Sequence, residues 1–166
     1  MTTEQSVDPR QYRDVIGRFA TGVTVITWDD GEVTRGMTAN AISSLSLDPM
    51  LLLICIDKKV SAHPQLLRSS AFAVNILAED QIEVSKAFAS HGQEAMPDGV
   101  SYERGTTGAP ILDNALAWID CEIAEHVEGG DHTIFFGRVV NISIPRPEAN
   151  PLLFWAGRYR NIGEQI

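Results

Sequence analysis

The sequence predicts a mainly β protein, an antiparallel β-barrel with peripheral helices. Predicted strands outnumber predicted helices by about six to about three, and neighbouring strands are joined by hairpin turns. The turn signals are Asp29-Asp30-Gly31 and Glu128-Gly129-Gly130-Asp131, and each lies between two apolar runs of strand length. A doubly wound parallel sheet would instead alternate each strand with a helix, which this chain does not do.

The first predicted element is a helix that begins after Asp8. Asp8 is a suitable N-cap, Pro9 suits the first helical position, and Gln11 completes a capping box. Apolar residues at helical spacing then form one face, and we expect the helix to end at Gly22. The residues of this face are Tyr12, Val15, Ile16 and Phe19.

Strands are expected next over Val23–Trp28 and, after the first turn, over Glu32–Thr38. The latter continues into a polar stretch, Asn40–Ser46, that closes at Asp48-Pro49. Leu51–Ile56 is uniformly apolar, which predicts a strand buried on both faces. A polar loop follows, and a short helix is expected to begin near His63.

The remainder of the chain is expected to contain more strand than helix. One side of its predicted helix presents Ile82, Ser85 and Phe88. The expected elements are, in order, a strand over Phe72–Leu77, that helix over Glu79–Ala89, an irregular segment over 91–110, a long hairpin of Ala115–Val127 with Thr133–Ile144, and a short strand over Leu152–Trp155.

Composition indicates one soluble globular domain. The 166 residues, 44% of them hydrophobic and 21% charged, fit a single domain over 1–166, with 1–7 as a flexible tail. No apolar run approaches the roughly 20 residues that cross a bilayer, and the N-terminus lacks the features of a signal peptide. The two cysteines, Cys55 and Cys121, lie inside apolar runs, so we expect reduced core thiols and a cytoplasmic protein. A net charge of −9 argues against a nucleic-acid partner.

Several common site motifs are absent or incomplete. Residues 17–24 have the glycine spacing of a P-loop, but Val23 stands where the lysine must be. The chain has no G-x-G-x-x-G, no C-x-x-C and no G-x-S-x-G, which excludes Rossmann-type nucleotide binding, the usual structural zinc site and a nucleophile elbow. We interpret His126, Glu128, Asp131 and His132 as polar residues of a turn rather than metal ligands.

Three stretches have the chemistry of a ligand site. Residues 36–49 are small and hydroxylated and could approach a flat polar ligand closely, or could simply satisfy their own backbone. Residues 55–64 combine two lysines, a serine and a helix start, which suit a phosphate or, alternatively, a solvated turn with a serine cap. Residues 129–132 form a hairpin turn that places His132 where it can border a pocket.

Together these stretches resemble the flavin reductase-like family, the NAD(P)H:flavin oxidoreductases of two-component flavin-dependent monooxygenases. The resemblance runs from Tyr12 to Tyr159 and includes the segments 18–27, 72–77 and 108–110. Two departures are Met50, where the family often has proline, and Ala62, where a hydroxylated residue often follows Ser61. Ala62 leaves backbone N–H groups to replace a side-chain contact to phosphate.

The resemblance implies a split β-barrel homodimer with a flavin site near the subunit interface. It implies FAD or FMN as the flavin, NADH or NADPH as the hydride donor, and a monooxygenase component that receives the reduced flavin. His132 would be the catalytic residue that positions the nicotinamide, which Tyr159 would also border, although Tyr159 could instead close the last strand against the barrel. The implied flavin contacts are Thr38, Ala39, Asn40, Ser43, Ser44, Cys55, Ile56, Asp57, Lys58, Ser61, Ala62 and Phe88, and Phe88 fits a helix core residue equally well.

The implied reaction is hydride transfer from the nicotinamide C4 to the flavin N5, in which the protein holds two rings in reacting contact. Reduced flavin would have to leave, so the flavin is expected to behave partly as a substrate. One alternative is a flavin-binding module, a sensor or carrier, without NAD(P)H turnover. Another is an oxidase of the pyridoxamine-phosphate-oxidase type, which the acidic charge balance disfavours. FAD and NADH are favoured over FMN and NADPH only by the wider family.

Overall fold

A computed structural model describes residues 7–90 and 95–163 of the chain. Six residues of the expected tail over 1–7 therefore lie outside the described residues. Within the described ranges the chain forms three helices and twelve strands, so the mainly β class is confirmed. Every strand pair is antiparallel.

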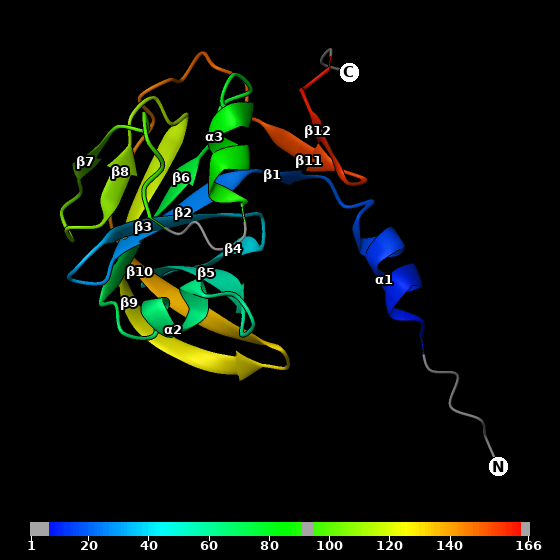
Figure 1. Ribbon diagram of the computed structural model, residues 1–166, viewed down its shortest axis with the longest axis horizontal. Helices are drawn as coiled ribbons and strands as arrows, with labels where there is room; N and C mark the ends of the chain where they lie inside the picture. Colours follow the sequence, from blue (N-terminus) through cyan, green and yellow to red (C-terminus); the bar gives the residue numbers. More distant parts are fainter. Residues whose placement is uncertain (1–6, 91–94, 164–166) are drawn as a thin grey trace.

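Seven strands form the main sheet in the order β3-β2-β6-β9-β10-β5-β4 (Figure 1). The edge strands β3 and β4 are consecutive in the chain and are joined only by Asn40 and Ala41. Because the three Cα steps of this link span at most about 11 Å, the sheet must roll until its edges approach at that corner. In the described residues no ladder pairs β3 with β4, so hydrogen bonds do not close the rolled sheet. The strands are β2 Thr24–Asp29, β3 Thr34–Ala39, β4 Ile42–Leu47, β5 Met50–Asp57, β6 Ala71–Ile76, β9 Ala117–Gly129 and β10 His132–Ser143.

Two smaller sheets and three helices surround the main sheet. A three-stranded sheet has the order β1-β11-β12, and β7 pairs with β8 (Figure 1). Helix α3 packs on β2 and β3, α2 packs on β5, and α1 projects from the body of the molecule. Their bounds are α1 Pro9–Ile16, β1 Thr21–Gly22, α2 Ala62–Leu66, α3 Ile82–Phe88, β7 Tyr102–Arg104, β8 Pro110–Leu112, β11 Leu153–Trp155 and β12 Arg158–Arg160.

Alternating residues of the strands build the core. In β5, Leu52, Ile54 and Ile56 are buried with Leu66 of α2, whereas Cys55 is only half-buried. The strand therefore buries one face, and the expectation that both faces are buried is wrong. The physical reason is that β5 lies beside an edge strand. Helix α2 packs on the face with Leu52, Ile54 and Ile56, and the opposite face with Cys55 is only partly covered.

The first helix is confirmed at its start and is shorter than expected. Asp8 caps it by accepting a hydrogen bond from the Arg10 N–H at 2.9 Å. It ends at Ile16, where the Gly17 N–H donates to the Arg13 carbonyl, and not at Gly22. Gly22 instead belongs to β1, because the chain there pairs with β11.

Other differences from the expected elements also arise from pairing between distant segments. The polar stretch over 40–46 contains all of β4 but its last residue, Leu47, since its residues pair with β5. The described part of the expected irregular segment, 95–110, includes β7 and the first residue of β8, and β12 follows the last expected strand. The long hairpin of β9 and β10 is confirmed, with a tight turn at Gly130, whose φ of 71° favours glycine. Of the expected core thiols, Cys121 is buried and Cys55 is half-buried.

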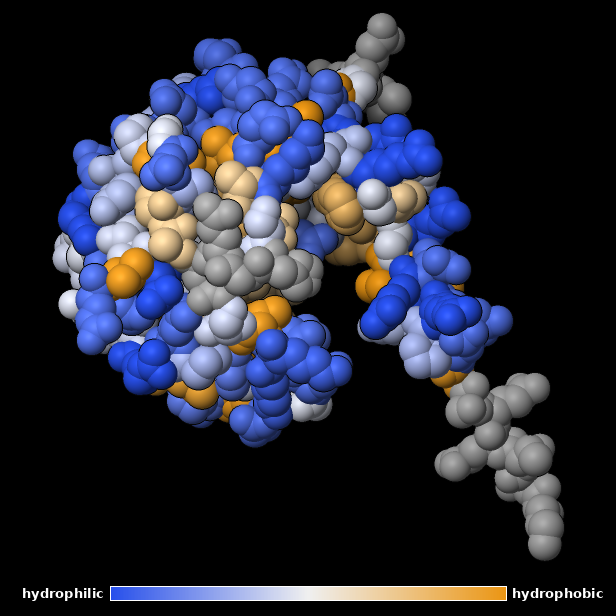
Figure 2. Space-filling view, in the orientation of Figure 1, coloured by the Kyte–Doolittle hydropathy of each residue, from blue (hydrophilic) through white to orange (hydrophobic). Residues whose placement is uncertain are grey.

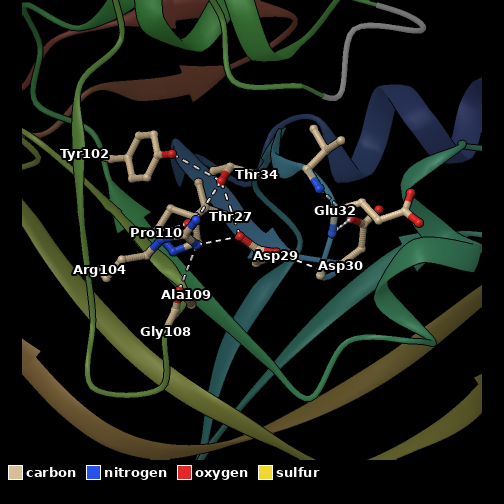
Figure 3. Close-up of polar contacts among 12 residues, drawn as sticks. Thr27, Asp29, Asp30, Glu32, Thr34, Tyr102, Arg104, Gly108, Ala109 and Pro110 are labelled. Atoms are coloured by element: carbon tan, nitrogen blue, oxygen red, sulfur yellow. Dashed lines mark hydrogen bonds and ion pairs between the residues drawn. The ribbon is translucent and has the colours of Figure 1, made fainter.

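A polar network fixes the β2–β3 hairpin to β7 (Figure 3). Arg104 forms an ion pair with Asp29 at 2.6 Å and donates to the Thr34 hydroxyl at 2.9 Å. Tyr102 donates to the same hydroxyl at 3.2 Å. At the turn, backbone N–H groups and Arg35, whose Nε lies 2.6 Å from the carboxylate, lower the pKa of Asp30 to about 2. The hairpin that leads into β3 is thus held from two sides.

Candidate active site

A small hollow lies at the corner where the two edges of the main sheet approach. Its volume is about 210 Å³, and Thr38, Ala39 and Asn40 at the end of β3 form one wall. Helix α3 and the C-terminal strands form the opposite wall. The remaining lining residues are Val23, Ser85, Ala89, Phe154 and Tyr159.

A second hollow of about 490 Å³ adjoins the first and shares Asn40 and Phe154 with it. Cys55 of β5 also lines it, as do residues of α1 and of the segment after α1. Ligand pockets are typically about 300–1,000 Å³ and mostly apolar with a few polar groups. The two hollows together have the size and the chemistry for a flat, largely aromatic ligand. The other residues of this lining are Arg13, Ile16, Gly17, Phe19, Thr21, Ala41, Ile42, Leu53, Ala156 and Gly157.

Hydrogen bonds fix the backbone of this corner. The Thr24 hydroxyl donates to the Ala39 carbonyl at 2.6 Å, and the Cys55 N–H donates to the Ala41 carbonyl at 3.0 Å. The Asn40 side chain donates to the Thr21 hydroxyl at 3.0 Å. The segment with the expected flavin contacts is therefore a preformed wall of the hollow.

Ser85 of α3 is a residue of this wall that the sequence analysis did not assign to the site. It is fully buried, and its hydroxyl lies 2.9 Å from the phenol oxygen of Tyr159. Its carbonyl accepts a hydrogen bond from the Thr38 hydroxyl at 2.6 Å. The signal in the sequence is a hydroxyl group on the apolar side of the helix, three residues from both Ile82 and Phe88.

The expected phosphate loop and the Gly-Asp-His turn are brought together. In the ladder between β5 and β10, His132 lies opposite Asp57. The Lys58 N–H donates to the Asp131 carbonyl at 3.0 Å, and the Lys58 ammonium donates to the Gly130 carbonyl at 2.8 Å and pairs with Glu128. This loop and the hairpin tip thus form one unit.

Hydrogen bonds also lower the pKa values of the two acidic side chains in this unit. His132 Nδ1 lies 2.7 Å from an Asp131 carboxylate oxygen, and this contact lowers the pKa of Asp131. The Lys58 ammonium lowers the pKa of Glu128 in the same way. Both carboxylates therefore stay ionised at neutral pH, and Asp131 orients the imidazole of His132.

Several expected contact residues do not line either hollow. The side chains of Ile56, Ala62 and Phe88 are buried in the core, so only their backbones could meet a ligand. Ser43 and Ser44 are exposed on β4. Their expected contacts with a flavin stay predictions.

The expected phosphate loop and His132 lie next to the hollows rather than in them. Cys55, which lines the larger hollow, is opposite Ile134 on β10, and His132 precedes Ile134 by two positions on the same strand. The Ser61 hydroxyl at the start of α2 makes no capping hydrogen bond. A ligand that extended from the larger hollow along the end of β5 would meet both this loop and His132.

Comparison with known proteins decides the family. A model of the flavin reductase like domain matches residues 16–163. The chain belongs to the flavin reductase-like family. A relative from Rhodococcus jostii, the reductase subunit HsaB of a flavin-dependent monooxygenase, is 40% identical over 158 residues, which are 95% of this chain and 80% of the relative.

Solved structures of the flavin reductase-like family agree in fold. The NADH:FAD oxidoreductase SgcE6 of Streptomyces globisporus has a TM-score of 0.89 and 39% identity, with 98% of this chain and 99% of that chain covered. The same enzyme in complex with NAD and FAD fragments has a TM-score of 0.87 and 40% identity over 96% and 97% of the two chains.

The residues present fit a flavin. Apolar side chains such as Phe19 and Phe154 suit the faces of a flat ring, and the Thr38 and Asn40 side chains supply polar groups at its edge. In the ranges 7–90 and 95–163, no group of three His, Cys, Asp or Glu side chains is placed to hold a metal ion. No helix in these same ranges is long and apolar enough to cross a membrane.

Proposed function

We propose that this chain is an NADH-dependent flavin reductase that transfers a hydride to FAD and supplies the reduced flavin to a monooxygenase component. The observation that supports the proposal most directly is the preformed pair of hollows at Thr38–Asn40, in a chain that belongs to the flavin reductase-like family. The names of its relatives agree, since one from Streptomyces globisporus, 41% identical over 161 residues, is an NADH-dependent FAD reductase.

In the proposed assignment, Thr38, Ala39 and Asn40 contact the flavin ring from one wall of the smaller hollow. Lys58, Ser61 and the backbone of Ala62 hold the phosphate. The Lys58 ammonium already has Glu128 as a partner, so a phosphate there would compete with that carboxylate. The other proposed flavin contacts are Ser43, Ser44, Cys55, Ile56, Asp57 and Phe88.

The bound flavin and the bound nicotinamide supply the redox chemistry, a hydride transfer from one ring to the other. The protein has to place the rings and exclude other geometries. The fixed backbone of the corner and the apolar walls of the larger hollow do this for the flavin. His132, oriented by Asp131, positions the nicotinamide, and Tyr159 borders it.

We further propose that the rolled sheet is a split β-barrel, that the whole chain is one domain, and that it works as a cytoplasmic homodimer with the flavin site near the interface. Two observations support the dimer. The apolar face of α1 is exposed, with Val15 71% accessible, and so is Phe19 just after the helix at 73%, although a helix of a folded protein usually buries such a face. Figure 2 shows apolar side chains on α1 where it projects from the body. Phe19 also lines the larger hollow, so a partner packed there would border the site.

The test is an assay of NADH loss with FAD, FMN or riboflavin added to the purified protein. Rapid NADH consumption that requires added flavin, fastest with FAD, supports a reductase. Flavin binding without NADH consumption would instead support a sensor or carrier module, and would overturn the proposal.

Replacement of His132 tests the nicotinamide site. We expect His132→Ala to raise the KM for NADH roughly 10-fold, the loss of one hydrogen bond worth about 1.4 kcal/mol, with an unchanged flavin Kd. Asp131→Asn, which keeps the imidazole but weakens its orientation, should have a smaller effect. An unchanged KM and kcat in His132→Ala would contradict this role.

A further inference from the structure

Ser85 contacts both walls of the smaller hollow. Its carbonyl accepts from Thr38 of β3, and its hydroxyl bonds to Tyr159 of β12. These two strands belong to different sheets and do not pair with each other. One buried residue of α3 thus joins the expected flavin wall to the expected nicotinamide wall through two separate groups.

Tyr159 depends on this hydroxyl for its orientation. It lies on β12, a strand of three residues that pairs only with β11 in the described part of the chain. The ring of Phe154 packs edge-on against it, with centroids 5.6 Å apart. Phe154 thus packs against the ring, and among the described residues Ser85 alone forms a hydrogen bond with its phenol oxygen. Without the hydroxyl of Ser85, the Tyr159 ring would keep its edge-on contact with Phe154 and lose the hydrogen bond at its phenol oxygen.

We propose that Ser85 is a positioning residue, which through Tyr159 sets the affinity for the nicotinamide while leaving the affinity for flavin nearly unchanged. This inference rests on the proposed function, because it takes Tyr159 as a border of the nicotinamide. The separation of effects follows from which group of Ser85 each neighbour uses. Thr38 bonds to the backbone carbonyl, so replacement of the side chain leaves that bond in place.

The kinetic test compares Ser85→Ala with Tyr159→Phe, which removes the same hydrogen bond from the other side. One hydrogen bond corresponds to a change of roughly 3- to 10-fold. We expect both variants to raise the KM for NADH by that factor, with kcat and the Kd for FAD, measured by flavin fluorescence, each within about 2-fold. Ser90→Ala is the matched control, because Ser90 is exposed just past the end of the same helix and its hydroxyl donates to the Lys86 carbonyl rather than to Tyr159.

The double variant shows whether Ser85 and Tyr159 affect the KM for NADH through the same hydrogen bond or independently. If Ser85 acts through Tyr159, Ser85→Ala with Tyr159→Phe should be no worse than either single variant. Additive effects on KM, an equal loss of flavin affinity, or a Ser85→Ala protein that behaves like Ser90→Ala would overturn the proposal. If Ser85→Ala did not fold, an unchanged KM for NADH in Tyr159→Phe would overturn it equally.

A measurement without any ligand tests the contact itself. The chain has three tyrosines, so carbon-13 ring labelling gives few signals, and Tyr159→Phe assigns one of them. In Ser85→Ala the Tyr159 signal should shift while those of Tyr12 and Tyr102 stay in place. An unchanged Tyr159 signal would overturn the inference. Failure of the proposed function is recognised separately, since a wild-type protein that did not consume NADH would still show this shift.

Discussion

The two cysteine side chains of the chain occupy different environments. Cys121 is fully buried in the main sheet, where burial raises the pKa of its thiol to about 12. Cys55 is half-buried and lines the larger hollow, and partial burial raises its pKa as well. Because the thiolate is the reactive form, both thiols react slowly, and only Cys55 is within reach of a reagent.

A thiol reagent at pH 8 is therefore expected to modify Cys55 and not Cys121 in the folded protein, and saturating FAD should slow that modification several-fold. Mass spectrometry of the labelled protein measures both effects. Cys55→Ser should abolish labelling until the protein is unfolded, whereas Cys121→Ser should leave the rate unchanged. Labelling of Cys55 at the same rate with and without FAD would count against its place in the flavin site.

Gly36 is required by the close approach of α3 to β3. A Cβ at this position would lie 2.5 Å from the ring of Phe88, so the ring and its helix would have to shift. We expect Gly36→Ala to lower the free energy of unfolding by about 1–3 kcal/mol, measured by urea denaturation. Gly22→Ala is the control, since a Cβ there meets nothing within 4 Å. Equal stability of the two variants would show that Phe88 adjusts freely.

Among the elements, the β2–β3 hairpin depends on charge. The polar network at its turn lowers the pKa of Asp30 to about 2, through backbone N–H groups and Arg35. Desolvation raises the pKa of Asp29, but the Gly31 N–H and Arg104 outweigh it, so that pKa is lowered as well. A carboxylate whose pKa is lower in the folded state stabilises the fold above its unfolded pKa of about 3.8. That contribution is lost as the pH falls through the folded pKa.

Asp30→Asn isolates the contribution of the charge, because an asparagine oxygen can still accept the backbone hydrogen bonds of the turn. At pH 7 the variant should be less stable than the wild type by on the order of 1 kcal/mol. The difference should shrink below about pH 5 and vanish only once the pH has fallen below the folded pKa of about 2. Urea denaturation at several pH values measures it, and a difference that stayed constant with pH would contradict an electrostatic origin.

The elements that the sequence predicted well are those set by neighbouring residues. The β9–β10 hairpin follows from its glycine turn, and the start of α1 follows from Asp8 and Pro9. Strands β1, β4 and β12 were missed because each is defined by a partner strand rather than by its own pattern, as Ser43 opposite Leu53 illustrates. The same limit applies to the site. Thr38 and Tyr159 are distant in sequence, and only the fold and the family relationship bring them to one hollow.

At the scale of the whole molecule, α1 is the part that the folded chain leaves uncovered. None of its residues is buried, yet one side of the helix is apolar. The chain just after the helix is bonded to the body, since the Ala156 N–H donates to the Gly17 carbonyl at 2.9 Å and Trp155 donates to the Arg18 carbonyl at 3.1 Å. A second copy of the chain would supply the missing cover in the proposed dimer.

Val15→Lys is expected to convert the proposed dimer to a monomer, because it places a charge in the apolar face without touching the residues that line the hollows. Light scattering coupled to size-exclusion chromatography measures the mass. Asp14→Lys, on another side of the same helix, should remain dimeric. A wild-type protein that is monomeric at micromolar concentration would contradict the proposed dimer.

The link of Asn40 and Ala41 between β3 and β4 has a consequence for how the chain can vary. This two-residue connection joins the two edge strands of one rolled sheet, and its length limits the distance between them. An insertion at this point would loosen both walls of the hollow without altering any side chain that lines it. The connection therefore acts through its length, which an insertion changes and a substitution does not.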